Sequence, residues 1–252
     1  MKGRVRTWCR CLPGYRALRM LWWWGKGGES RSLALLLLRR PRHLFQPYNT
    51  SAADRYPELF AFVRHQVADQ PGSRLLSFGC ARGEEIVSLR RLFEQAHIDG
   101  IDINRRNIAQ ARQRLADDPA VRLHVAGDAS VLPEASCDAV FALAVFRHGD
   151  LGGVKPALCC DRLIRFQDFE QVVTSLADSL RPGGLLCIRH ANFLFTQTAV
   201  AQGFEPVLYQ PACGSPLYGP DNLLMPSPAQ VPVVFRKVPA QGGQEQKTEC
   251  WR

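Results

Sequence analysis

The residues best suited to chemistry stand where four apolar runs of the chain end. After the first run, the segment Ser77–Glu85 carries Gly79 and Gly83, which allow a tight turn and a close approach of the backbone to a ligand. A helix that begins after such a turn offers unpaired N–H groups to a carboxylate or phosphate. Because glycines occur in many strand-to-helix turns, this segment alone predicts a binding turn without naming its ligand.

Acidic residues follow the next two runs. Asp102 stands 23 residues after Gly79, a distance at which a carboxylate suits two hydrogen bonds to a ribose diol. The alternative is that Asp102 or Asn104 caps the next helix. Asp128 can accept a hydrogen bond from an adenine amino group, with the small Ala129 leaving room for the ring. The alternative for Asp128 is a turn-forming aspartate.

The fourth run ends at Ala144. This residue would lie against the base or the reacting group; the alternative is that it simply belongs to the hydrophobic core. His148 follows in the next loop, where a titratable imidazole could take a proton from a hydroxyl or amine. We therefore predict His148 as a catalytic base, the alternative being a hydrogen-bonded loop histidine. Asp150 and His190 are the other titratable residues at these strand ends.

A sheet must bring these strand ends together. Strands alternate with helices along the chain, which predicts a parallel sheet covered on both faces, with ligands beyond the carboxyl ends of its strands. The predicted strands are 74–78, 98–103, 121–126, 137–144, 185–189, 204–209 and 231–238. The predicted helices are 56–68, 84–94, 105–115 and 166–180, the last stopped by the turn 181–184.

Together with Leu180-Arg181-Pro182-Gly183-Gly184 before the fifth strand, these residues resemble the class I S-adenosylmethionine-dependent methyltransferases over roughly 56–238. The resemblance implies an α/β, doubly wound, Rossmann-like sheet of seven strands, mostly parallel with an antiparallel last strand. It implies S-adenosyl-L-methionine as cofactor, its ribose on Asp102 and its adenine amino group on Asp128. The predicted cofactor-binding residues are Gly79, Cys80, Ala81, Gly83, Glu84, Asp102, Ile103, Asp128, Ala129 and Ala144.

The glycine-rich segment departs from that family at two positions. Ser77 replaces the leading acid of the family's loop, and Ala81 replaces its middle glycine. Gly-Cys-Ala-x-Gly-Glu-Glu looks like the loop of the chemotaxis receptor methyltransferases, in which a glutamate of the triplet reaches the cofactor's amino end. That likeness implies Glu84 as the substitute acid. It leaves open a protein carboxyl methyltransferase, and the two departures leave open a methyltransferase-fold protein that binds without catalysis.

Two other nucleotide-binding classes fit less well. A nicotinamide-binding loop would need glycine at position 81 and a small residue at position 84, and Glu84 would repel a pyrophosphate. S-adenosylmethionine carries an ammonium and a sulfonium and no phosphate, so an acid there is tolerable. A P-loop kinase is excluded because no Gly-Lys-Ser/Thr follows Gly83.

The charge of +9 is concentrated at one end of the chain. Residues 1–42 hold eleven basic residues and one acid, so the remainder is nearly neutral and a nucleic-acid-binding core is disfavoured. The nine cysteines contain no C-x-x-C pair, which argues against a zinc site or a disulfide scaffold and favours a reducing cytoplasm. We predict no metal.

We divide the chain into a basic Trp- and Leu-containing arm (1–45), a methyltransferase domain (46–240) and a polar tail (241–252). The arm could lie on an anionic membrane surface through residues 1–42, at the inner face of the membrane, or be a transit peptide or an extension without function. We expect 45–55 to fold over the cofactor and 210–230 to roof the acceptor site. The predicted acceptor is a small molecule or a cell-envelope or lipid-linked intermediate; the sequence sets no oligomeric state.

Overall fold

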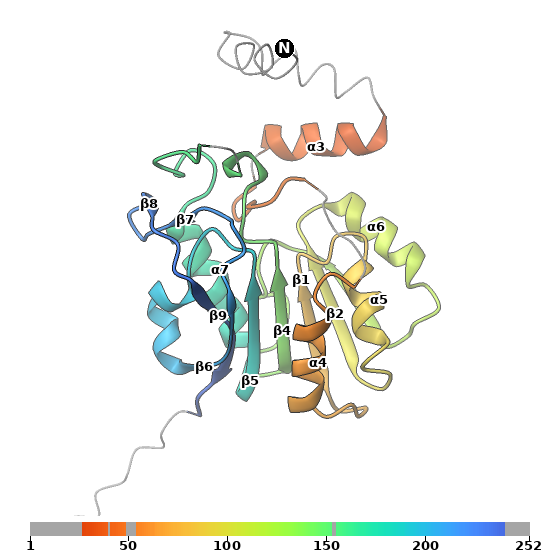
Figure 1. Ribbon diagram of the computed structural model, residues 1–252. Helices are drawn as coiled ribbons and strands as arrows, with labels where there is room; N and C mark the ends of the chain where they lie inside the picture. Colours follow the sequence, from red (N-terminus) through yellow and green to blue (C-terminus); the bar gives the residue numbers. More distant parts are fainter. Residues whose placement is uncertain (1–26, 40, 49–53, 153–154, 240–252) are drawn as a thin grey trace, which may run out of the picture.

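The computed structural model describes residues 27–39, 41–48, 54–152 and 155–239, and it contains a seven-stranded sheet in the order β3-β2-β1-β4-β5-β9-β6 (Figure 1). β1 to β5 run parallel, and β9 runs antiparallel between β5 and β6. The predicted doubly wound sheet with an antiparallel last strand is therefore confirmed. The strands are β1 (Arg74–Phe78), β2 (His97–Asp102), β3 (Val121–Val125), β4 (Cys137–Leu143), β5 (Leu180–Arg189), β6 (Phe204–Pro211) and β9 (Gln230–Lys237).

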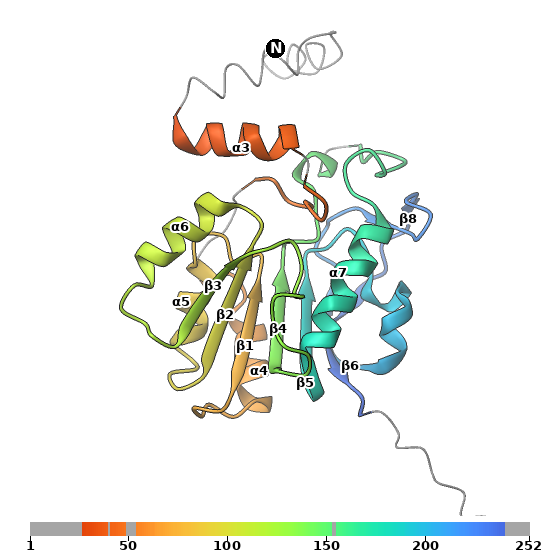
Figure 2. The ribbon, with the colours of Figure 1, turned by 180° about the vertical axis from the view of Figure 1, so that it is seen from behind.

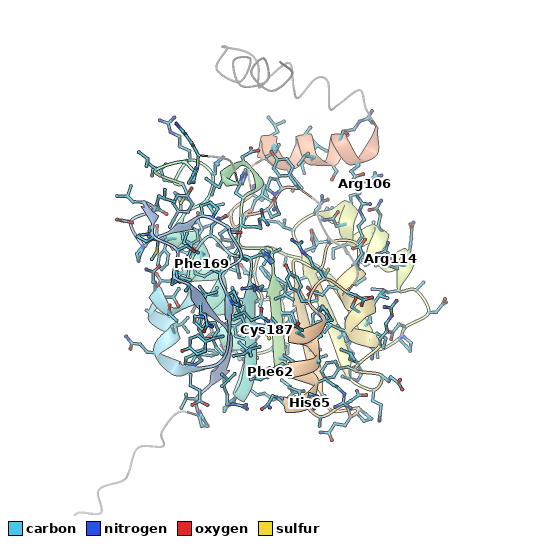
Figure 3. The ribbon with its side chains drawn as sticks, in the orientation of Figure 1. Phe62, His65, Arg106, Arg114, Phe169 and Cys187 are labelled. Atoms are coloured by element: carbon cyan, nitrogen blue, oxygen red, sulfur yellow. The ribbon has the colours of Figure 1, made fainter. Side chains whose placement is uncertain are left out.

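Helices cover both faces of this sheet because its central strands are apolar on both sides. One face packs on α4 (Pro57–Gln66), α5 (Glu84–Arg90) and α6 (Arg105–Arg114). The other face packs on α7 (Phe166–Ser179), which lies in front of the sheet in Figure 2. Figure 3 labels a residue of each core layer, Phe169 on α7 and Cys187 on β5. The short 3-10 helices are Gly149–Leu151, Phe195–Gln197 and Ala199–Gly203.

β5 begins at Leu180, five residues earlier than the predicted start at Leu185. We expected 181–184 to be a turn between helix and strand. Instead Leu180 pairs with Cys137, and the register shifts before Ala139 pairs with Leu185. Gly183, at φ +80°, takes up the extra length. The proline and glycines therefore form an irregularity inside the strand, which local turn preferences cannot distinguish from a separate turn.

Two features lay outside the sequence prediction. The helix α3 (Gly28–Arg39) stands over the edge of the sheet where the parallel strands end (Figures 1 and 2). It contacts the domain through a Glu29–Arg82 ion pair and through Ser32 Oγ, which donates to Asn104 Oδ1 at 2.9 Å. Within 210–230, the two-residue strands β7 (Leu217–Tyr218) and β8 (Leu224–Met225) pair as a second, small sheet.

The two ends of the predicted domain division lie largely beyond the described residues. Residues 1–26 of the arm and 240–252, which contain the predicted tail, are not among them. Of the helices in the described ranges, none is long and apolar enough to cross a membrane.

Candidate functional site

A pocket of about 970 Å³, part of it open to solvent, lies at the carboxyl ends of β1 and β2. Five of the ten predicted cofactor-binding residues line it: Gly79, Ala81, Asp102, Ile103 and Ala144. The pocket therefore stands where the strand order 2-1-4 reverses direction, as the topology of an open α/β sheet requires.

Backbone geometry shapes the first wall of this pocket. Gly79 has φ +78°, and a Cβ at this position would lie 2.7 Å from Val145 Cγ2. The N–H groups of Gly79 and Cys80 both donate to Ile101 O, at 2.8 and 3.0 Å. Ala81 has φ +49°, in the left-handed region that favours glycine. Alanine thus adopts a left-handed conformation that glycine would adopt without strain.

Asp102 ties this loop to the second strand. Its Oδ2 accepts from the Ala81 N–H at 3.0 Å, and its Oδ1 accepts from the Asn104 N–H at 2.7 Å and from Asn107 Nδ2 at 3.1 Å. Burial raises the pKa of Asp102 to about 6. The helix cap of α6 is Asn104, which accepts from the Arg106 N–H at 2.9 Å. The carboxylate of Asp102 is therefore not the cap, and Oδ2 keeps a lone pair for a ligand hydroxyl.

The two adjacent glutamates of the loop point to different places. Glu84 Oε1 pairs with Arg114 of α6 at 2.8 Å, and Glu84 does not line the pocket (Figure 3 labels Arg114). Glu85 does line it, and accepts a hydrogen bond from Ser77 Oγ at 2.7 Å. Removal from water raises the pKa of Glu85 to about 8. The acid that faces the pocket beside Ser77 is thus Glu85, one residue after the predicted one.

Four further predicted residues support the pocket without lining it. Cys80 is buried behind the loop, and Gly83 occupies the N-cap position of α5 at φ +86°. Ala129 is buried, and its N–H donates to Ser175 Oγ at 3.1 Å. Asp128 Oδ2 lies 3.5 Å from His43 Nδ1, and His43 lines the pocket in its place.

The segment 43–48 forms the outer wall of the pocket. Phe45 is buried and packs edge-on against Phe146, with ring centroids 5.2 Å apart. Tyr48 OH donates to the carboxylate of Asp150 at 3.1 Å. Phe45, Tyr48 and Arg55 line the pocket. Of the segment 45–55 that we expected to fold over the cofactor, residues 49–53 lie outside the described residues.

His148 lies outside this pocket. It lines a separate cleft on the other side of the segment 41–47, and its Nδ1 accepts from the Asp150 N–H at 3.2 Å. Burial lowers the pKa of His148, so the imidazole is neutral at pH 7. His190 lies nearer the pocket, because its Nδ1 is 2.8 Å from the hydroxyl of Tyr56, a pocket residue.

A family model described as a methyltransferase domain matches residues 76–188, from β1 to β5. This part of the chain holds the glycine-containing loop, Asp102 and the strand ends that border the pocket. Residues 76–188 therefore form a methyltransferase domain of the class I S-adenosylmethionine-dependent type. The predicted family and its cofactor, S-adenosylmethionine, are thereby confirmed.

Solved methyltransferase structures resemble the chain at low identity. A provisionally assigned rRNA-methylase from Clostridium thermocellum is 16% identical over 75% of this chain and 100% of that one, with a TM-score of 0.47. An S-adenosylmethionine-dependent methyltransferase from Aquifex aeolicus is 17% identical over 65% and 72%, with a TM-score of 0.39. The chain matches no curated protein sequence.

Another similar structure is phosphoethanolamine N-methyltransferase 2 of Haemonchus contortus, with phosphomonomethylethanolamine and S-adenosylhomocysteine bound. It is 20% identical over 53% of this chain and has a TM-score of 0.38. This chain spans only 28% of its length.

The pocket residues that were not predicted from the sequence include Glu85, Tyr56 and His43. The sequence does indicate that Glu84 and Glu85 point in different directions. Residue 84 begins the helix, and Glu85 projects about 100° away from it around the helix axis. Nothing in the sequence pairs His43 with Asp128, since that contact depends on how the segment before the domain folds back.

Proposed function

We propose that this chain transfers the methyl group of S-adenosylmethionine to a small-molecule acceptor. The observation that carries the proposal is the pocket at the ends of β1 and β2, with the glycine wall at Gly79, an Asp102 lone pair and a carboxyl group at Glu85. These groups fit the cofactor, because its ribose offers hydroxyl donors and its amino end is a cation. A dinucleotide fits poorly, since its pyrophosphate would approach Glu85.

When bound, the cofactor supplies an electrophilic methyl group on a sulfonium, which leaves as a neutral thioether. The protein's own residues bind and orient. Asp102 would accept from the ribose hydroxyls, Glu85 would pair with the ammonium, and the turn at 79–81 would border the methionine part. The segment 43–48 would exclude water from the reacting atoms.

The acceptor that we propose is a small molecule with an apolar portion. Leu36, Leu44, Phe45 and Val145 contribute apolar walls to the part of the pocket beneath the 43–48 segment. Apolar walls of this kind suit the apolar portion of a small ligand. We retain a lipid-linked acceptor as the second candidate, because Leu38 of α3 is exposed near this opening and the basic arm precedes it.

A general base is required only if the acceptor loses a proton. We keep His148 as the predicted base for that case, since its pKa is lowered and the neutral imidazole can accept a proton. Because the segment 41–47 separates His148 from the cofactor pocket, His148 can reach the acceptor only around that segment. Full turnover by a His148→Ala variant would remove this assignment.

The test is calorimetric titration of the full chain with S-adenosylmethionine, S-adenosylhomocysteine and, as a control, NADH. We expect micromolar binding of both adenosyl ligands and none of NADH. Methyl transfer is then followed with labelled cofactor and a panel of apolar hydroxyl, thiol and amine acceptors. Binding without transfer to any acceptor would favour the non-catalytic reading, and absence of binding would overturn the proposal.

The lipid-linked alternative has its own measurement. Partitioning onto vesicles of phosphatidylglycerol and phosphatidylcholine is compared for the full chain and for a chain lacking residues 1–26, which keeps α3 and its contacts with Arg82 and Asn104. Equal partitioning of the two chains would exclude a membrane role for those residues.

A further inference from the structure

The end of the cofactor pocket beside β3 is closed by a residue from outside the sheet. Ala126 and Gly127 follow β3, Ile103 follows β2, and all three line the pocket. His43, from the segment between α3 and α4, lines the same end. A Cβ at Gly127 would lie 3.4 Å from His43 Cβ and 3.4 Å from Ile103 Cδ1. Because position 127 has no side chain, the space that borders both of these residues is left free.

The polar groups after β3 that could recognise the edge of a base are engaged within the protein. The Oδ1 atom of Asp128 accepts from the N–H and the hydroxyl of Ser130, at 3.1 and 2.6 Å. Its Oδ2 faces His43 Nδ1 at 3.5 Å. The N–H of Ala129 donates to Ser175 Oγ at 3.1 Å. Neither Asp128 nor Ala129 lines the pocket, so His43 is the side chain that a base would meet there.

The ring of His43 is held through its two nitrogens. Nδ1 faces Asp128, and Nε2 lies 3.4 Å from Oε1 of Gln171 on α7. Arg42 donates to the same Gln171 atom at 2.8 Å, and because a guanidinium can only donate, that atom is the amide oxygen. Both ring nitrogens therefore face groups of the protein, and the ring has its carbon atoms and its π face left for a ligand.

The backbone at His43 is strained. Leu44 N–H donates to Pro41 O at 3.3 Å, which makes His43 the third residue of a tight turn. His43 has φ +68° there, a value that turns usually take with glycine or asparagine. Phe45, two residues on, is buried against Phe146 and fixes the turn to the domain. Strained residues that the surrounding structure holds in this way cluster at ligand sites.

We propose that His43 holds the base of the cofactor by stacking, and that the site binds purines without recognising the exocyclic group at position 6. The placement rests on the proposed function: with the ribose on Asp102, the base would extend toward the end of the neighbouring strand β3. There it would lie between His43 and Ile103. Stacking tolerates different bases because every base has a π face. Asp128 is then a positioning residue that acts on the base through His43.

The experiment compares two ligands that differ only at that exocyclic group. The full chain is titrated calorimetrically with S-adenosylhomocysteine and with S-inosylhomocysteine, in which a carbonyl oxygen replaces the amino group. We expect dissociation constants within about fivefold of each other, and Asp128→Asn should leave their ratio unchanged. A hydrogen bond from the amino group to a carboxylate would instead give a preference of more than about tenfold.

The outcomes separate this proposal from the proposed function. Binding of the adenosyl ligand with a preference larger than fivefold would overturn stacking as the means of recognition. Loss of such a preference in Asp128→Asn would assign the amino group to that carboxylate. Absence of binding by both ligands would overturn the proposed function, and the role of His43 with it.

Variants of His43 test the ring itself. His43→Ala should weaken binding of both ligands by about tenfold or more, which is the usual contribution of base–aromatic stacking. His43→Phe keeps a ring face without the nitrogens, so it should recover most of the affinity, and a loss as large as in His43→Ala would contradict stacking. His65→Ala is the matched control, since His65 is exposed on α4, away from the cofactor pocket (Figure 3).

A measurement on the unaltered chain distinguishes stacking from a purely structural role. The ring protons of the histidines are followed by NMR in isotope-labelled protein as S-adenosylhomocysteine is added. Those of His43 should move upfield, because the ring current of a stacked base shields them, and those of His65 should stay in place. Unmoved His43 signals in the presence of bound ligand would overturn the proposal, whether or not the variants fold.

Discussion

The two pockets of this molecule differ in what shapes them, the backbone in one and side chains in the other. The cofactor pocket is shaped by backbone, with a glycine at φ +78°, an alanine at φ +49° and a carboxylate that holds three donors. The second pocket, of about 440 Å³ beyond the carboxyl end of β5, is shaped by side chains from β5, β9 and the segment 212–217, with a histidine and a cysteine among apolar walls. A site shaped by the backbone can be recognised from a short stretch of sequence, because it needs particular residues at close spacing. A site assembled from the side chains of distant segments has no such local pattern.

The largest effect expected in the backbone-built pocket is at Gly79. Gly79→Ala places a Cβ 2.7 Å from Val145 Cγ2 at a positive φ, so the loop must move. We expect cofactor affinity to fall by roughly thirtyfold or more, equivalent to ~2 kcal/mol of strain and displacement. Titration with S-adenosylhomocysteine measures it. Gly72→Ala is the matched control, since nothing lies within 4 Å of its Cβ position. Unchanged affinity in Gly79→Ala would contradict a backbone-shaped site.

Asp102→Asn tests the carboxylate that joins the two strands. The amide keeps one acceptor and loses the charge, so we expect cofactor binding to weaken by more than about tenfold. Asp69 offers a matched control far from the pocket, because it also accepts from three backbone N–H groups, those of Glu94, Gln95 and Ala96. Asp69→Asn should lower the melting temperature and leave affinity intact. Equal affinity in both variants would exclude the ribose role of Asp102.

Glu85→Gln against Glu84→Gln decides which glutamate meets the cofactor's amino end. We expect about a tenfold loss of affinity for Glu85→Gln and little change for Glu84→Gln, whose side chain pairs with Arg114. At pH 7 the wild type should release up to one proton on binding, because Glu85 has its pKa near 8 in the free protein and an ammonium would lower it. Calorimetry in buffers of different ionisation enthalpy detects that proton. If Glu85→Gln still releases a proton when the cofactor binds, that proton comes from another group.

The same shift predicts a pH dependence of stability. The pKa of Glu85 is raised from 4.5 to about 8, so between these values the folded state binds more protons than the unfolded state. The free energy of unfolding of the cofactor-free protein should therefore fall as pH rises from 4.5 to 8. Glu85→Gln should flatten this slope and melt about 2–4 °C higher than wild type at pH 8 but not at pH 4.5. An unchanged slope would mean that Glu85 is not enclosed.

The smallest effect is expected at Ala81. Ala81→Gly removes the strain of a Cβ at φ +49° but adds flexibility to the unfolded chain, so we expect a net gain of ~0.5 kcal/mol and a slightly higher melting temperature. Ala135, at φ +47° and outside the cofactor pocket, is the matched control. If Ala81→Gly alone loses cofactor affinity, the alanine contributes directly to the site.

Most of the fold could be predicted because its elements are locally encoded. The seven strands of the sheet and four helices follow from apolar runs, helical spacing and turn residues, and their bounds agree within a few residues apart from Leu180. The start of β5 escaped because Pro182 and Gly183 read as a turn, whereas pairing of Leu180 with Cys137 draws them into the strand. The strands β7 and β8, two residues each, are too short for any periodicity.

The sequence by itself determined the sheet, the glycine-containing turn and Asp102, because each depends on residues close together in the chain. Only the tertiary structure decided that Glu85 rather than Glu84 faces the pocket, since that depends on the rotation of α5 against β1 and α6. It also decided that His148 lies behind the 41–47 segment, and that Tyr56 and His190 meet. Tyr56 and His190 stand 134 positions apart, and no local pattern links them. Their contact arises because parallel strands deliver distant segments to one edge of the sheet.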